Sequence, residues 1–207
     1  MRCCAIRVSR GISTTRIEQA MIPRPADAVA LRAPLADGEV RIVPFAQEHV
    51  APLRVACEQD REIWAIYPVN MLAEDADERL RAFHGEDGWV RFAAFRGDHL
   101  VGTTSYIHPD PANGTLMIGG TYIEPSARGG DYNRRMKHLM IDHAFACGFW
   151  RIEFTVDTRN GRSMAAMRKL GAVEEGVMRR NRVTWTGHVR DTALFSILAE
   201  EWTANRR

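Results

Sequence analysis

The sequence is poor in cysteine, and its cysteines form no recognisable motif. Four are present, and no two are spaced as a Cys-x-x-Cys pair: Cys3, Cys4, Cys57 and Cys147. A disulfide framework or a metal-binding cysteine cluster normally needs more cysteines at closer spacing. We therefore expect reduced, buried thiols, a cytoplasmic protein and no metal site.

Long apolar runs and a strong charge bias are also missing. No apolar stretch approaches the length of a membrane span, so we expect no membrane partner. The 28 basic and 26 acidic residues give a net charge of +2, which is too small to indicate a nucleic-acid partner. The chain has 207 residues, of which 45% are hydrophobic and 26% charged, and these values are typical of one soluble globular domain.

The first 38 residues differ in composition from the remainder. They begin with an arginine-rich stretch that lacks acids until Glu18 and continue with a segment rich in proline and alanine. A transit peptide has this composition, but a partly disordered extension with Met21 as an alternative start fits equally well. We predict an extension over 1–38, with a short edge strand near 29–31, and a single domain over 39–203.

The central stretch, 115–149, reads as a strand, a glycine-containing turn and an amphipathic helix. Pro125 ends the strand because proline has no N–H group for the sheet. Gly129 and Gly130 form the turn, and Gly148 ends the helix. Such a turn directs free N–H groups outward at the positive end of a helix dipole, which favours an anion such as phosphate.

The remaining pattern predicts the order β-α-α-β-β-β-α-β-α-β-β. This order indicates an α+β layered domain, with helices flanking a mixed and mostly antiparallel sheet. We expect Ser163 to be the N-cap of a helix over 163–170. The other predicted helices cover 48–59 and 73–83, and the other predicted strands cover 40–43, 89–95, 100–107, 151–156, 173–180, 181–186 and 188–196.

Three sequence motifs carry a family resemblance that extends from about Val40 to Trp202. They are IGGTYIEPSARGGDYN, RNGRSMAAMRKLGA and GHVRDTALFSI. With this order of elements, the chain resembles the GNAT superfamily of acetyl-CoA-dependent N-acetyltransferases. Within it, the chain is most similar to the branch that includes the ribosomal-protein N-terminal acetyltransferases. The resemblance implies the GNAT fold, acetyl-CoA as co-substrate without a metal, and a possible homodimer.

The resemblance also implies a set of cofactor-binding residues. They are Ile123, Arg128, Gly129, Gly130, Asp131, Tyr132, Asn133, Asn160 and Ser163. Asp131 departs from the family pattern, which has glycine at this point. A carboxylate there would repel a pyrophosphate unless its side chain points outward.

The catalytic residues implied by the resemblance are Ser163 and Glu124. Ser163 would protonate the leaving thiolate, although capping a helix explains it equally well. The base is not determined: Glu124, at the end of the central strand, is a candidate, and a solvated loop acid explains it at least as well. His108, Tyr106, Asp157 and a water relay are the alternatives for the base.

The expected function is transfer of an acetyl group to a primary amine by direct attack in a ternary complex. The acceptor can be a protein N-terminus, an amino acid or a small amine. The alternative is a non-catalytic acyl-CoA-binding domain. By resemblance, Trp64 and Tyr67 would line the acceptor site, although core packing explains them too. Arg179, Arg180 and Arg182 either steer an acidic substrate or form a solvated basic face.

Overall fold

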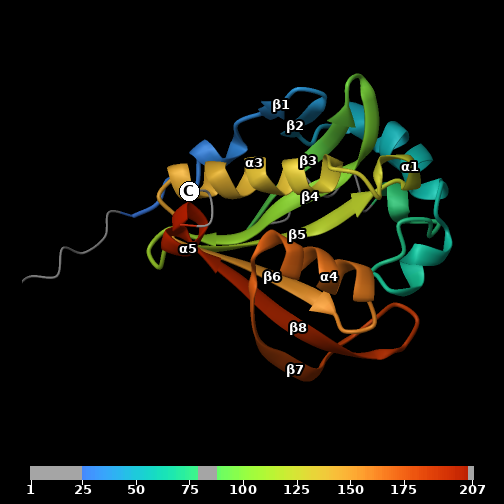
Figure 1. Cartoon of the computed structure of the whole chain (residues 1–207). Helices are drawn as coiled ribbons and strands as arrows, with labels where there is room; N and C mark the ends of the chain where they lie inside the picture. The colour runs from blue at the N-terminus through green and yellow to red at the C-terminus, as the bar shows by residue number, and fades with distance from the viewer. Residues whose placement is uncertain (1–24, 79–87, 205–207) are drawn as a thin grey trace, which may run out of the picture.

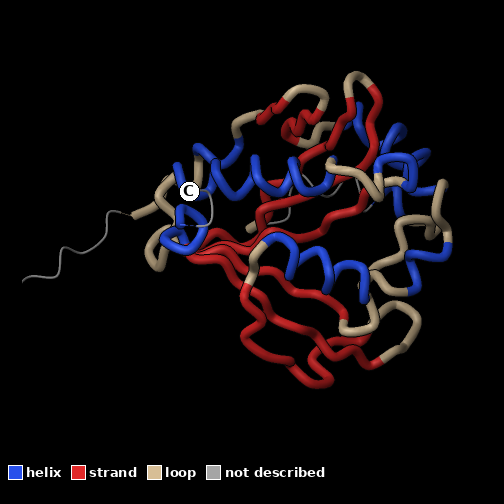
Figure 2. Tube along the Cα trace, viewed as in Figure 1, coloured by secondary structure: helices blue, strands red, loops and turns tan. Residues whose placement is uncertain are grey.

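The computed structural model describes residues 25–78 and 88–204. Its centre is a twisted 8-stranded sheet with helices on both faces, which confirms the expected α+β architecture (Figures 1 and 2). The strands lie in the order β1-β2-β3-β4-β5-β6-β8-β7. Their bounds are β1 Leu35–Asp37, β2 Val40–Pro44, β3 Trp89–Arg96, β4 His99–Asp110, β5 Thr115–Ile123, β6 Arg151–Asp157, β7 Val173–Val183 and β8 Val189–Leu198.

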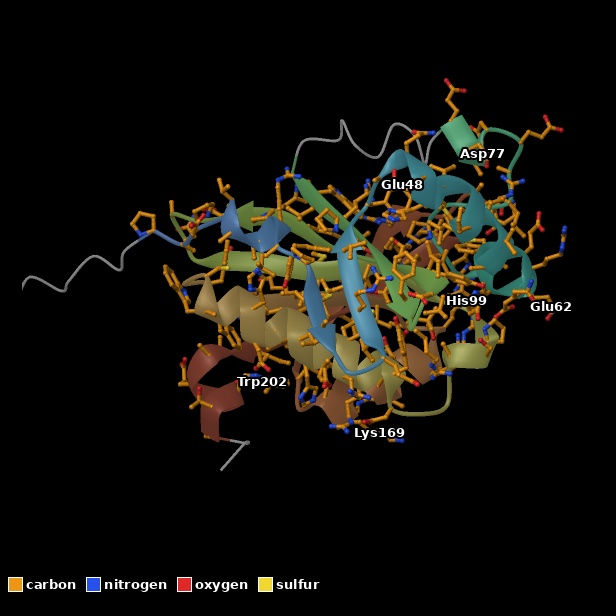
Figure 3. All side chains as sticks on the ribbon, turned by 90° about the horizontal axis from the view of Figure 1, so that it is seen from above. Glu48, Glu62, Asp77, His99, Lys169 and Trp202 are labelled. Atoms are coloured by element: carbon orange, nitrogen blue, oxygen red, sulfur yellow. The ribbon has the colours of Figure 1, made fainter. Side chains whose placement is uncertain are left out.

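The helices divide between the two faces of this sheet. The α-helices are α1 Val50–Glu58, α3 Tyr132–Ala146, α4 Gly161–Leu170 and α5 Ala199–Ala204, and short 3-10 helices are η1 Ala30–Arg32, η2 Gln47–His49, η3 Glu62–Ala65 and η4 Pro125–Ala127. Figure 1 shows α3 and α4 on one face with β5 running between them. In Figure 3, Glu48 and Asp77 lie on one side of the sheet, and Lys169 and Trp202 lie on the other.

Two hydrophobic clusters hold the helices to the sheet. The larger cluster joins α3 and α4 to the strands through buried residues such as Met136, Met140 and Met167. The smaller cluster joins α1 and η3 to the opposite face, around Trp64 and Tyr122. Because side chains of a strand alternate between faces, successive residues of β5 contribute to different clusters.

The sheet opens between β5 and β6. These neighbours run parallel, and they pair only at Thr115, Leu116 and Met117, opposite Arg151, Ile152 and Glu153. All the other neighbouring strands pair antiparallel. Beyond Met117 the two strands have no paired residues, so their carboxyl ends diverge. This divergence leaves main-chain groups of β5 without a strand partner on that side.

Gly102 lets β4 and β5 approach each other closely beside this opening. A Cβ at Gly102 would lie 2.0 Å from the carbonyl oxygen of Tyr122, a distance at which no side chain fits. The pairing register also shifts between Thr103 and Ser105, where β5 bulges at Gly120 and Thr121. These features fix the path of β5 toward the turn that follows it.

The N-terminal arm differs from the sequence prediction. The edge strand expected near 29–31 is wrong, because η1 occupies Ala30–Arg32 and the edge strand is β1. The arm packs on the domain through Leu31, which is fully buried, and Ala26. Residues 1–24 lie outside the described part of the chain.

Other boundaries also need correction. The first helix begins at Val50 after the short η2, and β7 is one strand rather than two. The hairpin turn expected at Thr186 and Gly187 is confirmed, since it lies between β7 and β8. The predicted helix over 73–83 lies outside the described residues from 79 onward.

Candidate active site

The turn between β5 and α3 is built for an anion. Gly129 has φ +78°, a conformation that favours glycine, and α3 starts at Tyr132 directly after the turn. In the described chain, the main-chain N–H groups from Gly129 to Arg134 have no acceptor. A Cβ on Gly129 or Gly130 would meet no heavy atom within 4 Å, so both glycines face open space. Free N–H groups at the positive end of a helix fit a pyrophosphate.

The Asp131 carboxylate makes no capping hydrogen bond to these amides. The carboxylate accepts two hydrogen bonds from the guanidinium of Arg134, at 2.6 and 2.8 Å. Both side chains are more than half exposed, so the pair adds little stability. The pair does place the negative charge of Asp131 next to the positive charge of Arg134, one turn along the helix. The turn can therefore take an anion despite the carboxylate.

Arg128 holds the start of the turn through hydrogen bonds of its side chain and main chain. Its Nε donates to the carbonyl oxygen of Ile123 at 2.6 Å, and its Nη1 pairs with Asp60. Its own N–H group donates to the carbonyl oxygen of Pro125 at 3.0 Å. Arg128 therefore fixes the end of β5, whereas the free amides begin one residue later.

The first residues of α4 lie at the end of β6, on the other side of the opening. The Oδ1 atom of Asn160 accepts from the N–H group of Ser163 at 3.0 Å, so Asn160 is the N-cap of α4. The expectation that Ser163 caps this helix is wrong, because its hydroxyl makes no such bond. In the described chain the half-buried hydroxyl of Ser163 has no hydrogen-bond partner, so it is available for chemistry.

Aromatic residues close the opposite face of the sheet at the same end. Trp64 stacks on Tyr122, with ring centroids 4.8 Å apart, and the hydroxyl of Tyr67 donates to the carbonyl oxygen of Thr121 at 2.6 Å. The Nε1 atom of Trp185, in the β7–β8 turn, donates to the carbonyl oxygen of Trp64 at 2.7 Å. The β7–β8 turn therefore contacts η3, the element that carries Trp64.

Comparison with known proteins decides the family. A family model described as "Acetyltransferase (GNAT) domain" matches residues 39–173. The chain belongs to the GNAT acetyltransferase family. It is therefore an acetyl-CoA-dependent N-acetyltransferase, and the alternative of a non-catalytic acyl-CoA-binding domain receives no support.

Solved structures of other GNAT proteins resemble this one over most of its length. A protein from T. thermophilus described as an acetyltransferase is 34% identical over 83% of this chain and 92% of its own, with a TM-score of 0.74. A GCN5-related N-acetyltransferase from Brucella melitensis is 28% identical over 90% of this chain and 86% of its own, with a TM-score of 0.80. Mycobacterium smegmatis RimJ in complex with CoA-disulfide shares the fold at 23% identity, over 82% and 87% of the two chains, with a TM-score of 0.69. The comparison with curated proteins gave no match.

Two absences hold for residues 25–78 and 88–204 of this GNAT protein. No helix among them is long and apolar enough to cross a membrane. No group of three or more histidine, cysteine, aspartate or glutamate side chains among them is arranged to hold a metal ion.

Glu124 is not the solvated loop acid that the sequence also allowed. It is 5% exposed, and its Oε1 lies 3.1 Å from the Nε2 atom of His99 and also accepts from the hydroxyl of Ser126. The side chain of His99 is 65% exposed. A buried carboxylate at the end of β5 thus has a hydrogen-bonded connection to solvent.

The other candidate bases of the GNAT site are less suitable. Tyr106 is buried and donates to the carbonyl oxygen of Met140 at 2.8 Å, and burial raises its pKa. His108 lies near the end of β4 that pairs with the start of β5, away from the turn. Asp157 is buried, which raises its pKa, but hydrogen bonds from Arg159 outweigh this effect and leave its pKa lowered. Asp157 therefore stays charged, and its oxygens already accept hydrogen bonds from Arg159.

The structure adds Lys137, which the sequence analysis missed. This residue of α3 is 4% exposed, and its Nζ atom donates to the hydroxyls of Thr121 at 2.7 Å and Thr104 at 3.4 Å. One turn earlier, the Oδ1 atom of Asn133 is buried without a partner in the described chain. The signal was visible, since Lys137 stands between the apolar residues Met136 and Met140 on the buried side of the helix. Beyond the free amides, the first turns of α3 thus carry a buried acceptor, Asn133 Oδ1, and a buried donor, Lys137 Nζ.

Lys137 predicts a pH-dependent stability. Burial lowers its pKa to about 7, whereas a lysine in the unfolded chain keeps its proton up to about pH 10.4. Between these values the unfolded state binds more protons, so the free energy of unfolding rises with pH. We expect a gain of about 1.5 kcal/mol between pH 7 and 8.5, measured by urea unfolding.

Lys137→Met removes the titrating group while keeping an unbranched chain. Its stability should change little over the same pH range. Parallel pH profiles for the wild type and the variant would show that Lys137 does not titrate in this way.

Proposed function

We propose that this acetyltransferase transfers the acetyl group of acetyl-CoA to a primary amine by direct attack in a ternary complex. The acceptor is a protein N-terminus, an amino acid or a small amine. One observation carries the proposal: the row of free amides from Gly129 to Arg134 stands beside the opening between β5 and β6. A cofactor whose pyrophosphate binds at the turn can extend its thioester into this opening. There the thioester can be reached from both faces of the sheet.

The residues of this chain have separate roles in the proposed reaction. Acetyl-CoA supplies an activated acetyl group and a thiolate leaving group. The amides of Gly129–Arg134 hold the pyrophosphate, with Asn133 beside them. As the amine nitrogen bonds to the acetyl carbon, Glu124 accepts the proton that the amine loses, and His99 connects it to solvent. As the carbon–sulfur bond breaks, the hydroxyl of Ser163 donates a proton to the sulfur and regains one from solvent. Amide and free CoA thiol are the products.

Free-thiol release with a panel of primary amines tests this function. We expect thiol release from acetyl-CoA that depends on the amine and is matched by mass gain of one acetyl group on that amine. Thiol release without an acetylated amine would show hydrolysis instead. Binding of acetyl-CoA without any release would contradict the proposal.

We also propose a cytoplasmic location and a homodimer. In the described chain both cysteines, Cys57 and Cys147, are free thiols, as expected for a reducing compartment. The edge strand β7 is exposed along its whole length, including Val173 and Val177. Exposed apolar side chains on an edge strand favour pairing with a second copy. Sedimentation velocity of the purified chain distinguishes dimer from monomer.

A further inference from the structure

Arg190 is a buried arginine that the described structure leaves incompletely bonded. It is 6% exposed, and its Nε atom has no hydrogen-bond partner among the described residues. Among the described residues its one ion pair is long, with Nε 3.9 Å from the Oδ2 atom of Asp157. A buried guanidinium without its hydrogen bonds costs free energy, so the position calls for a further acceptor.

Asp157 cannot fully serve Arg190 because it already binds another arginine. Arg159 donates to both of its carboxylate oxygens, at 3.0 and 2.7 Å. Arg182 faces Arg190 directly across the β7–β8 pairing. Arg159 and Arg190 therefore share one carboxylate, and Arg182 adds a third guanidinium group opposite Arg190, so positive charge is in excess. Consistent with this, burial lowers the pKa of Arg190; Asp157 raises it, but Arg182 and Arg159 lower it again, and the pKa stays lowered.

The cluster lies on the acceptor side of the sheet. Along β8, Ala193, Phe195 and Ile197 belong to the cluster under α3 and α4, so Arg190 points to the opposite face by strand alternation. That face carries η3, to which Trp185 of the β7–β8 turn is hydrogen-bonded. Asp157 ends β6, beyond the point where β6 diverges from β5. The excess positive charge thus stands beside the opening, opposite the helices that flank the pyrophosphate turn.

We propose that Arg190, supported by Arg182, binds an anionic group of the acceptor amine, either a carboxylate or a phosphate. Guanidinium groups donate two parallel hydrogen bonds to such groups, and the buried position makes each bond stronger than at the surface. The acceptor class is therefore a primary amine that carries a negative charge a short distance from its nitrogen. This inference rests on the proposed acetyl transfer to amines and names the acceptor for that same site.

Matched pairs of acceptors test the inference. One pair is β-alanine and β-alaninamide, and the other is O-phosphoethanolamine and ethanolamine, so each pair differs in the anionic group. We expect kcat/KM to favour the anionic member of at least one pair roughly 10-fold or more, as for a charge-assisted hydrogen bond. The pair that shows the larger preference identifies whether the site binds a carboxylate or a phosphate.

Variants separate binding of the anion from a structural role. Arg190→Gln should reduce the preference to within about twofold while the KM for acetyl-CoA stays unchanged. Arg190→Lys keeps the charge and should retain part of the preference, and it replaces the glutamine variant if that variant does not fold. Lys169→Gln is the control for charge, because Lys169 is exposed on α4, on the other face of the sheet (Figure 3). It should leave the preference unchanged.

Two kinetic results would overturn the inference. The wild type could acetylate charged and neutral acceptors equally well, or the glutamine variant could keep the wild-type preference. Either result leaves the acetyl transfer itself intact, whereas acetylation of no amine at all refutes the proposed function. A turnover-independent arm covers that case: calorimetry of inorganic phosphate and of acetate with CoA-saturated protein should detect binding of at least one anion that Arg190→Gln abolishes, and binding of neither anion to the wild type would refute the anion site.

Discussion

Gly130→Glu is expected to weaken acetyl-CoA binding roughly 30-fold, or by about 2 kcal/mol. The new carboxylate would stand beside the free amides of the turn and repel the pyrophosphate. The fold should tolerate it, because a Cβ at Gly130 meets no atom within 4 Å and Gly130 is not among the positive-φ glycines. Isothermal titration calorimetry measures the affinity, and a melting curve checks the fold.

Gly130→Lys is the matched control for this change. It adds a side chain of similar length and opposite charge, so it should bind acetyl-CoA at least as tightly as the wild type. Equal weakening by both variants would mean that bulk, and not charge, decides binding at the turn. An unchanged affinity in Gly130→Glu would place the pyrophosphate elsewhere.

Ser163→Ala is expected to lower kcat about 100-fold with little change in the KM for acetyl-CoA. The reason is that in the proposed reaction the hydroxyl protonates the leaving thiolate, and it has no other partner in the described chain. The melting temperature should stay close to that of the wild type, since the N-cap of α4 is the side chain of Asn160. Steady-state kinetics with thiol detection gives both constants.

Asn160→Ala provides the contrast, because it removes the cap and should cost about 1 kcal/mol of stability. A wild-type kcat in Ser163→Ala would remove Ser163 from the chemistry. A melting temperature that falls as far as that of Asn160→Ala would assign it a structural role instead.

The sequence predicted those parts of the fold that depend on local patterns. The strand, glycine turn and helix around Gly129 follow from alternation, from proline and glycine positions and from helical spacing, and the structure confirms them. The edge strand was misplaced because Leu31 is apolar for a different reason, which is its packing into the core from η1. Local propensity cannot tell such tertiary burial from strand formation.

Side-chain partners decided what the sequence left open at the site. Arg134 pairs with the carboxylate of Asp131 and so reduces its repulsion of an anion at the turn. Asn160 caps α4, which leaves the hydroxyl of Ser163 without a capping role. Both pairs are close in sequence, but their geometry is set only once the helix starts are fixed. The sequence shows that Lys137 and Arg190 are charged. It does not show that they are buried, because their burial depends on tertiary packing.

Titration of the 15N-labelled protein with CoA, followed by amide NMR, tests the central claim most directly. We predict that the amide signals of Gly129 through Arg134 shift most strongly with CoA and do not shift with pantetheine, which lacks the pyrophosphate. If these signals stay in place while other amides respond to CoA, the turn does not hold the pyrophosphate and this account of the site is wrong.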